Sequence, residues 1–174
     1  MTYKEALTQA MTDLARDPRR VFVGYNVRYG SKANGTLAHV PESQLIETPV
    51  AENLMMGLAI GLALEGFKPV VWYERFDFVL NASDAIVNHL DKLKMISRGE
   101  YAPAVIIRAN VGSSTKPLFT GVTHTQDFTK AFRALVSFKV APLRDVPQIQ
   151  AEYAAAGASG ESSMFVEYRD LDEQ

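Results

Sequence analysis

The sequence has 174 residues, of which 47% are hydrophobic and 22% are charged, which is enough to bury the core of one ordinary globular domain. Its net charge is −2 and it has no run of basic residues, which argues against nucleic acid or an anionic membrane as the main partner. Cysteine is absent, which excludes disulfides and thiolate metal sites, and no apolar run is long enough to cross a membrane, so we expect a cytoplasmic protein.

Apolar periodicity predicts helices and short strands that alternate along the chain. Helices are expected at residues 3–14, 49–64, 78–97, 128–135 and 146–156. Strands are expected at residues 20–24, 43–47, 68–73, 103–108, 138–141 and 164–168. Two segments rich in Gly, Ser, Asn and Thr, residues 27–42 and 110–127, are expected loops. This alternation predicts a doubly wound α/β domain with a mostly parallel sheet, helices on both faces, and ligands beyond the carboxyl ends of the strands.

Glu52 stands at the start of a helix that is apolar on nearly every side. A carboxylate there can serve only to balance the positive end of the helix. It does not complete a capping box, because Ala51 occupies the position three residues after Thr48. The helix carries Gly57 and Gly61, and a helix that is apolar all round is a buried one, so we expect a partner subunit to cover it. From the residues alone, a structural and a functional role for Glu52 both stay open.

Several strings, in this order, resemble the pyrimidine-binding domain of thiamine diphosphate enzymes. They are TPVAE at 48–52, GFKPVVWYERFDF at 66–78, DAIVN at 84–88 and GVTHTQ at 121–126. The likeness is to the N-terminal domain of the E1 β subunit of 2-oxoacid dehydrogenases and to the central domain of transketolases. It extends over almost the whole chain, and it implies one pyrimidine-binding domain over 1–174 with the thiamine diphosphate-binding fold.

The resemblance also implies roles for individual residues around the cofactor. Glu52 would hydrogen-bond the aminopyrimidine ring and share a proton with it, which makes it the first candidate for catalysis. Phe78 would pack on that ring, with Phe76 as the alternative aromatic contact. Glu74 falls where relatives have an apolar cofactor contact, so this chain departs from the pattern there.

The same resemblance implies a substrate side to the site. His124 matches a histidine that faces the substrate and exchanges protons, and Gln126 would support it. His39 lies in the first loop and could approach the substrate. The histidines have no metal-ligand spacing, so no metal site is expected in this chain. Loop cations could serve an anionic substrate, although solvated loop charge is their more ordinary interpretation: Arg28, Lys32 and Lys116.

The family holds Mg²⁺ and diphosphate with a Gly-Asp-Gly motif, and this sequence has none. Mg²⁺ and diphosphate are therefore expected on a partner chain that carries the motif, in an α2β2 heterotetramer. We expect no C-terminal transketolase-like domain after the last predicted strand. The expected function is ketol transfer, 2-oxoacid decarboxylation or carboligation on a small carbonyl substrate. The alternatives are a non-catalytic subunit of the same fold and a flavodoxin-like nucleotide-binding module.

Overall fold

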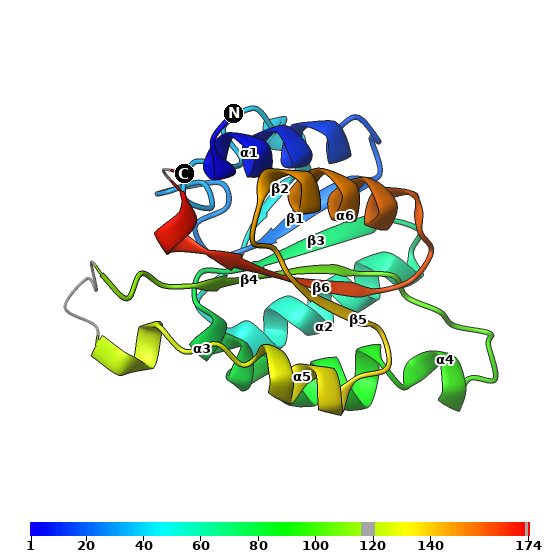
Figure 1. The fold of residues 1–174 in the computed structure, drawn as a ribbon. Coiled ribbons are helices and arrows are strands. Elements are labelled where there is room, and N and C mark those ends of the chain that lie inside the picture. Colours follow the sequence, from blue (N-terminus) through cyan, green and yellow to red (C-terminus); the bar gives the residue numbers. More distant parts are fainter. Residues whose placement is uncertain (116–120, 173) are drawn as a thin grey trace.

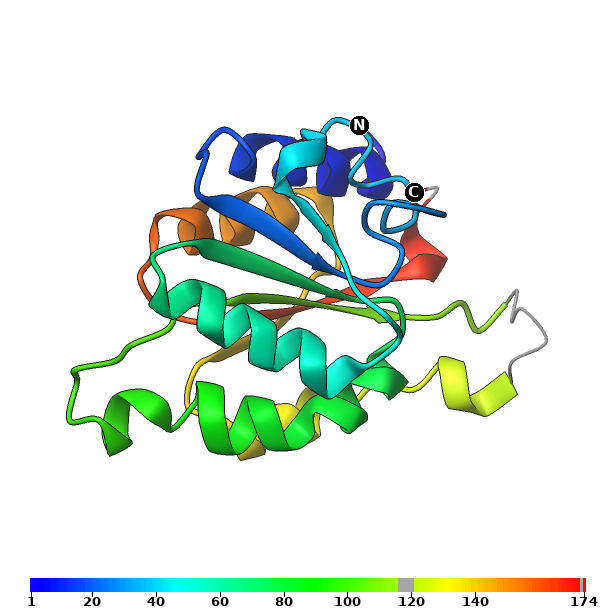
Figure 2. The ribbon, with the colours of Figure 1, turned by 180° about the vertical axis from the view of Figure 1, so that it is seen from behind.

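In the computed structural model, which describes residues 1–115, 121–172 and 174, six strands form one all-parallel sheet between two layers of helices (Figures 1 and 2). The spatial order of the strands is β2-β1-β3-β4-β6-β5. Their bounds are Arg20–Gly24 for β1, Leu45–Glu47 for β2, Lys68–Tyr73 for β3, Ile106–Val111 for β4, Lys139–Pro142 for β5 and Ser163–Tyr168 for β6. The predicted doubly wound α/β domain is confirmed.

The spatial order of the strands reverses at β1, and this reversal determines where the site lies. β1 pairs with β2 on one side and with β3 on the other, with Val23 opposite Ile46 and Val71. The connections that follow β1 and β3 therefore leave the sheet in different directions, which opens a crevice at the carboxyl ends of these two strands. Gly24 ends β1 at a φ of +156°, and a side chain there would place its Cβ 2.7 Å from the carbonyl oxygen of Trp72. Glycine thus allows the close approach of β1 and β3 at the crevice.

The helices form two layers, one on each face of the sheet (Figure 1). α1 (Tyr3–Leu14) and α6 (Val146–Ala158) lie side by side on one face. α2 (Glu52–Leu64), α3 (Phe76–Val79) and α5 (Thr129–Leu135) lie on the other. The bounds of α1, β1 and β3 equal the predicted ones, and a capping box between Thr2 and Glu5 starts α1.

The helix expected over residues 78–97 is the main error in the predicted elements. The segment divides into α3, a 3₁₀ turn at Leu80–Ala82, a π-helical stretch at Ala85–Leu90 and α4 at Leu93–Ile96. Asp91 follows the π-helical stretch, and its carboxylate accepts hydrogen bonds from the backbone N–H and the hydroxyl of Ser137, both at 2.7 Å. This tertiary tie accompanies the irregular winding, and apolar periodicity carries no sign of it.

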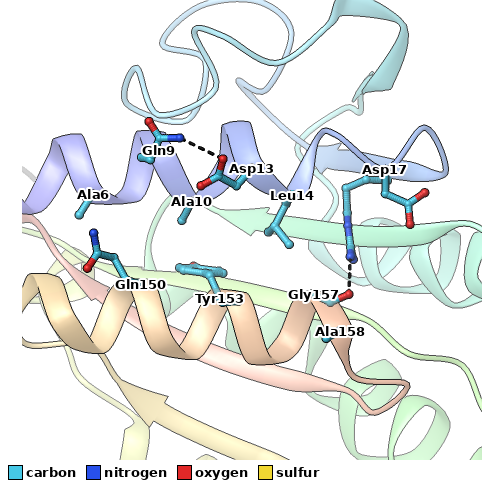
Figure 3. Close-up of a pocket in the computed structure, with 12 residues that line it drawn as sticks. Ala6, Gln9, Ala10, Asp13, Leu14, Asp17, Gln150, Tyr153, Gly157 and Ala158 are labelled. Atoms are coloured by element: carbon cyan, nitrogen blue, oxygen red, sulfur yellow. Dashed lines mark hydrogen bonds between the residues drawn. The ribbon is translucent and has the colours of Figure 1, made fainter.

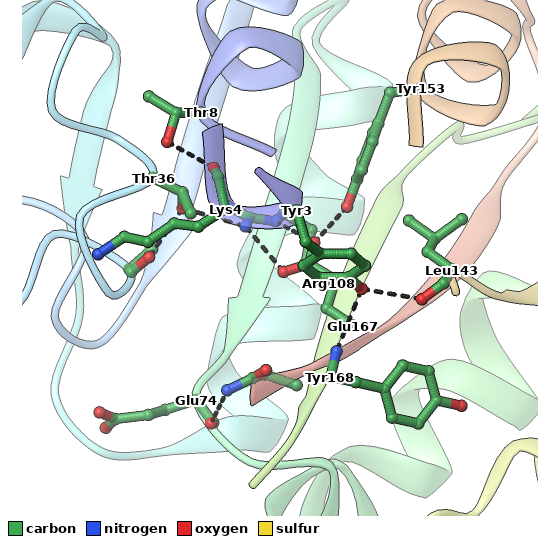
Figure 4. Close-up of polar contacts among 12 residues, drawn as sticks. Tyr3, Lys4, Thr8, Thr36, Glu74, Arg108, Leu143, Tyr153, Glu167 and Tyr168 are labelled. Carbon is green, nitrogen blue, oxygen red and sulfur yellow. Dashed lines mark hydrogen bonds and ion pairs between the residues drawn. The ribbon is translucent and has the colours of Figure 1, made fainter. Parts of the chain in front are cut away.

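A polar network lies buried between the sheet and the α1/α6 layer (Figure 4). Arg108 on β4 and Glu167 on β6 are 0% and 2% exposed and form a bidentate ion pair, with N···O distances of 2.7 and 2.9 Å. Tyr153 of α6 donates to Glu167, and Thr36 of the first loop accepts from Arg108 at 3.0 Å. Burial is the largest single effect and lowers the pKa of Arg108, but the charges and hydrogen bonds of Glu167 and Tyr153 together outweigh it, and the pKa is raised. The network ties the first loop to the sheet.

Within the described ranges, no helix has the length and apolar character needed to cross a membrane.

Candidate functional site

A cavity of about 60 Å³ lies in the crevice at the carboxyl ends of β1 and β3. Its lining is mostly apolar and includes two carboxylates: Tyr25, Val50, Glu52, Met55, Trp72, Tyr73, Glu74 and Phe78. Ligand sites are mostly apolar, with a few polar groups that fix the orientation of the ligand. The structure therefore brings Glu52, Glu74 and Phe78 together, three of the residues that the sequence singled out.

Glu52 is the first residue of α2, because Ala51 before it is extended, with φ −153° and ψ 81°. Its backbone carbonyl accepts a hydrogen bond from the Tyr73 hydroxyl at 3.1 Å. Its carboxylate accepts only one long bond, 3.3 Å from Nδ2 of Asn81, and no cation of the described chain lies at ion-pair distance from it. The carboxylate thus keeps lone pairs for a ligand in the cavity.

His124 does not line the cavity itself, but its ring contacts Phe78, which does. The two rings meet edge to face, with centroids 5.1 Å apart and planes at 85°. His124 ends a 3₁₀ turn at Gly121–His124, and its Nδ1 lies 3.0 Å from the hydroxyl of Thr123. An imidazole in this position can exchange a proton with a molecule that sits above Phe78.

Three other predicted residues do not lie at the cavity. Phe76 is 0% exposed, packs in the core against the ring of Phe128, 5.7 Å away, and does not line the cavity. The amide of Gln126 donates to Asp77 at 2.7 Å instead of supporting His124. His39 is exposed and lines a shallow hollow beside α1, on the other face of the sheet.

The predicted loop cations are satisfied within the loop itself. Arg28 and Lys32 both contact the carboxylate of Glu42, each at 3.1 Å. Lys116 lies outside the described residues. Glu74 keeps its carboxylate at the cavity, where Oε2 accepts a weak bond from Nδ2 of Asn26 at 3.4 Å.

Glu47 is a site-edge residue that the sequence did not single out. Its carboxylate accepts hydrogen bonds from the successive backbone N–H groups of residues 26–29, at 2.8, 3.0, 2.8 and 3.3 Å. Successive amides arranged in this way form an anion-binding nest. The turn after β1 reads Gly24-Tyr25-Asn26, without a carboxylate of its own, and Glu47 supplies one from the end of β2.

Sequence patterns also did not identify Asn81, whose amide donates to the Glu52 carboxylate, or most of the apolar residues that line the cavity. An asparagine in a helical segment gives no local sign of such a role. The lining residues, in turn, have the pattern of ordinary strand and helix residues. The pairing of β1 with β3 and the packing of α2 and α3 on β3 bring them together.

A larger groove, of about 380 Å³, separates α1 from α6 (Figure 3). Small side chains such as Ala6, Ala10 and Ala158 line it. Its acids have partners, since Asp13 pairs with Arg16 and Asp17 pairs with Lys68. The groove lies on the face opposite the Glu52 cavity and is a gap between two helices rather than part of the site.

Known proteins resemble this chain in sequence. The model of the family "Transketolase, pyrimidine binding domain" matches residues 1–166. The β subunit of the mitochondrial pyruvate dehydrogenase E1 component of Saccharomyces cerevisiae is 33% identical over 146 residues, which is 80% of this chain and 39% of that protein. The corresponding subunit of Rickettsia conorii is 29% identical over 145 residues, 80% of this chain and 44% of that one. The chain thus spans less than half the length of these relatives.

Solved structures share the fold. A structure described as "Split gene transketolase, inactive beta4 tetramer" has a TM-score of 0.76 at 20% identity, over 97% of this chain and 52% of that one. Transketolase from Campylobacter jejuni has a TM-score of 0.76 at 17% identity, over 97% of this chain and 26% of that one. Together with the match over residues 1–166, these likenesses establish that the chain belongs to the transketolase pyrimidine-binding domain family.

Proposed function

We propose that this chain supplies the pyrimidine-binding half of a thiamine diphosphate site, and that a second polypeptide supplies the half that holds Mg²⁺ and diphosphate. The complex would break or form a carbon–carbon bond next to a carbonyl, by ketol transfer, 2-oxoacid decarboxylation or carboligation. The observation that carries the proposal is the Glu52 carboxylate, which has no cationic partner in the described chain and lines an apolar cavity at the carboxyl ends of β1 and β3.

The residues at the cavity suit an aminopyrimidine. Met55 and Phe78 offer apolar surface to the faces of a ring, while Glu52 offers a carboxylate to a ring nitrogen. When bound, thiamine diphosphate supplies an acidic carbon that becomes the nucleophile toward a carbonyl and an electron sink. Glu52 would hold the proton shared with the ring, Phe78 would exclude water from it, and His124 would exchange a proton with the substrate.

The outer face of α2 supports an interface with the second chain. Leu54 and Leu58 are 53% and 37% exposed, although they belong to an apolar helix. A side chain at Gly57 or Gly61 would meet nothing within 4 Å, so this face is open. An exposed apolar stripe with small residues is a surface that another subunit can cover closely. The solved split-gene transketolase β4 tetramer is described as inactive, which is consistent with an activity that needs a further chain.

The experiment is co-expression with a candidate partner that carries Gly-Asp-Gly, followed by calorimetric titration with thiamine diphosphate and Mg²⁺. We expect binding to the pair and to neither chain alone. Tight binding of the cofactor by the isolated chain would refute the shared site and would favour a self-sufficient nucleotide-binding module.

A substitution tests the role of Glu52 within the complex. Glu52→Gln should abolish turnover while the complex still assembles, because an amide cannot share the proton in the same way. Glu65→Gln is the matched control, since Glu65 lies at the other end of the same helix and is exposed. Full turnover in Glu52→Gln would point to a non-catalytic subunit.

A further inference from the structure

Arg75 is a partly buried cation in the two-residue turn between β3 and α3, directly after Glu74. In the described residues no carboxylate lies at ion-pair distance from it. Its hydrogen bond is to the carbonyl oxygen of its neighbour Glu74, 2.6 Å from Nη1. A guanidinium has several further N–H donors in a planar fork. These donors have no acceptor in the described chain.

Tight packing places Arg75 next to His124. Gly112 follows β4, and a side chain there would put its Cβ 2.1 Å from the carbonyl oxygen of His124 and 3.2 Å from Cδ and Nε of Arg75. The absence of a side chain at Gly112 thus lets the arginine and the histidine turn meet. His124 in turn contacts Phe78, which lines the Glu52 cavity. Arg75 and the backbone of His124 therefore both lie against Gly112, and the ring of His124 contacts Phe78 at the cavity.

The neighbouring cations differ from Arg75 because each has a carboxylate. Arg169 pairs with Asp172 at 2.8 Å, and Arg144 contacts Asp127 at 3.7 Å. Burial lowers the pKa of Arg75; Glu74 and Asp77 oppose this effect, and the positive charge of Arg169 adds to it. A partly desolvated cation without a counter-charge at contact distance is unfavourable. An external anion would relieve this cost.

We propose that Arg75 binds the oxyanion group, carboxylate or phosphate, of the carbonyl substrate on the β4 side of His124. The planar guanidinium suits a bidentate contact with either group. The place of this contact in the reaction rests on the function proposed above, but the anion contact itself is a property of this chain and can be measured without the cofactor.

The first test uses the full chain, labelled with ¹⁵N and observed by NMR at the arginine Nε–Hε groups. Inorganic phosphate and pyruvate are titrated separately at constant ionic strength, with chloride as the balancing anion. We expect a saturable shift of the Arg75 signal with at least one of the two anions, and the responding anion identifies the group. Arg75→Gln should remove the response, and the matched control Arg98→Gln should keep it, since Arg98 follows α4, which lies at the amino end of the strands and away from α3 (Figure 1). An absent or non-saturable response, or an equal response to chloride, would overturn the proposal.

The second test uses the complex, with pairs of probes that differ in charge. Pyruvate is compared with acetaldehyde, and glycolaldehyde phosphate with glycolaldehyde. Arg75→Gln should raise KM for the charged member of one pair about tenfold and change the neutral member by less than about twofold, while Arg75→Lys should give an intermediate value. An equal rise for both members would mean that Arg75 only supports the fold. If the pair of chains binds no cofactor, the proposed function fails, and the NMR result still decides whether Arg75 binds anions.

Discussion

Charged side chains have different surroundings on the two faces of the sheet. On the α1/α6 face, Arg108 and Glu167 are buried and satisfy each other, with Tyr153 and Thr36 completing most of the network. On the α2 face, Glu52 has one weak hydrogen bond, and apolar side chains stay exposed along α2. The first face is completed by residues of its own chain. The second face has the features of a surface that another molecule completes. A charged residue therefore contributes to folding on one face and is available for binding or chemistry on the other.

Removal of the Glu167 carboxylate, which is buried on the α1/α6 face, should have the largest effect on stability. Glu167→Ala leaves Arg108 buried without a counter-charge, so we expect the free energy of unfolding to fall by about 3–5 kcal/mol, measured by urea denaturation. The double variant Arg108→Met/Glu167→Leu should recover most of that loss, because an apolar pair avoids the desolvation of two charges. A single variant that unfolds like the wild type would show that the two faces do not differ in this respect.

A charge introduced on the exposed side of α2 should instead weaken association with the partner chain. Leu58→Asp should change the free energy of unfolding of the isolated chain by less than about 0.5 kcal/mol, because the side chain is already exposed. It should weaken association with the partner chain by about tenfold or more, which sedimentation velocity can measure. Leu135→Asp is the control, since Leu135 is also exposed but lies at the end of α5. Equal association of the two variants would exclude α2 as the interface.

A substitution of Asp170 tests whether hydrogen bonds to a carboxylate in the loop after β4 stabilise the fold, as those on the α1/α6 face are expected to do. Hydrogen bonds from Ser113 and then Ser114 lower the pKa of its carboxyl to about 2. Because the pKa is lower in the folded state, the carboxylate stabilises the fold above its usual pKa of 3.8, and this contribution is lost as the pH falls toward 2. Asp170→Asn should lower Tm slightly at neutral pH and flatten its dependence between these values. An unchanged pH profile would mean that these bonds do not stabilise the fold.

Glu52→Gln should have the smallest effect on stability. Its carboxylate has one long hydrogen bond to lose, so the free energy of unfolding of the isolated chain should change by less than about 0.5 kcal/mol. Urea denaturation beside Glu167→Gln gives the direct comparison of the two carboxylates. A large loss of stability in Glu52→Gln would make Glu52 a structural residue.

Local patterns predicted the elements that depend on local interactions. α1 with its capping box and the apolar strands β1 and β3 have the expected bounds. Glu52, Glu74 and Phe78, which line one cavity, were grouped by the resemblance to a family and not by local pattern. Tertiary contacts determined what was missed. The tie from Asp91 to Ser137 accompanies the irregular winding of the 78–97 segment.

The buried ion pair also could not be predicted in full. Arg108 and Glu167 each interrupt an apolar strand, and a single charge in such a run is a sign of buried pairing. Their partnership requires that β4 and β6 be neighbours, although β5 lies between them in the sequence. The same holds for Arg75 and His124, whose contact depends on the course of the chain around Gly112.

The backbone amides of residues 26–29 already bind the Glu47 carboxylate, so another anion has to compete with Glu47 for them. Glu47 is part of the same chain, so its carboxylate competes with any dissolved anion at a high effective concentration, on the order of millimolar or more. A dissolved anion can therefore bind these amides only by displacing the Glu47 carboxylate. Anion selectivity at this end of the sheet is thereby left to side chains, whose identity can change in evolution without rebuilding the backbone.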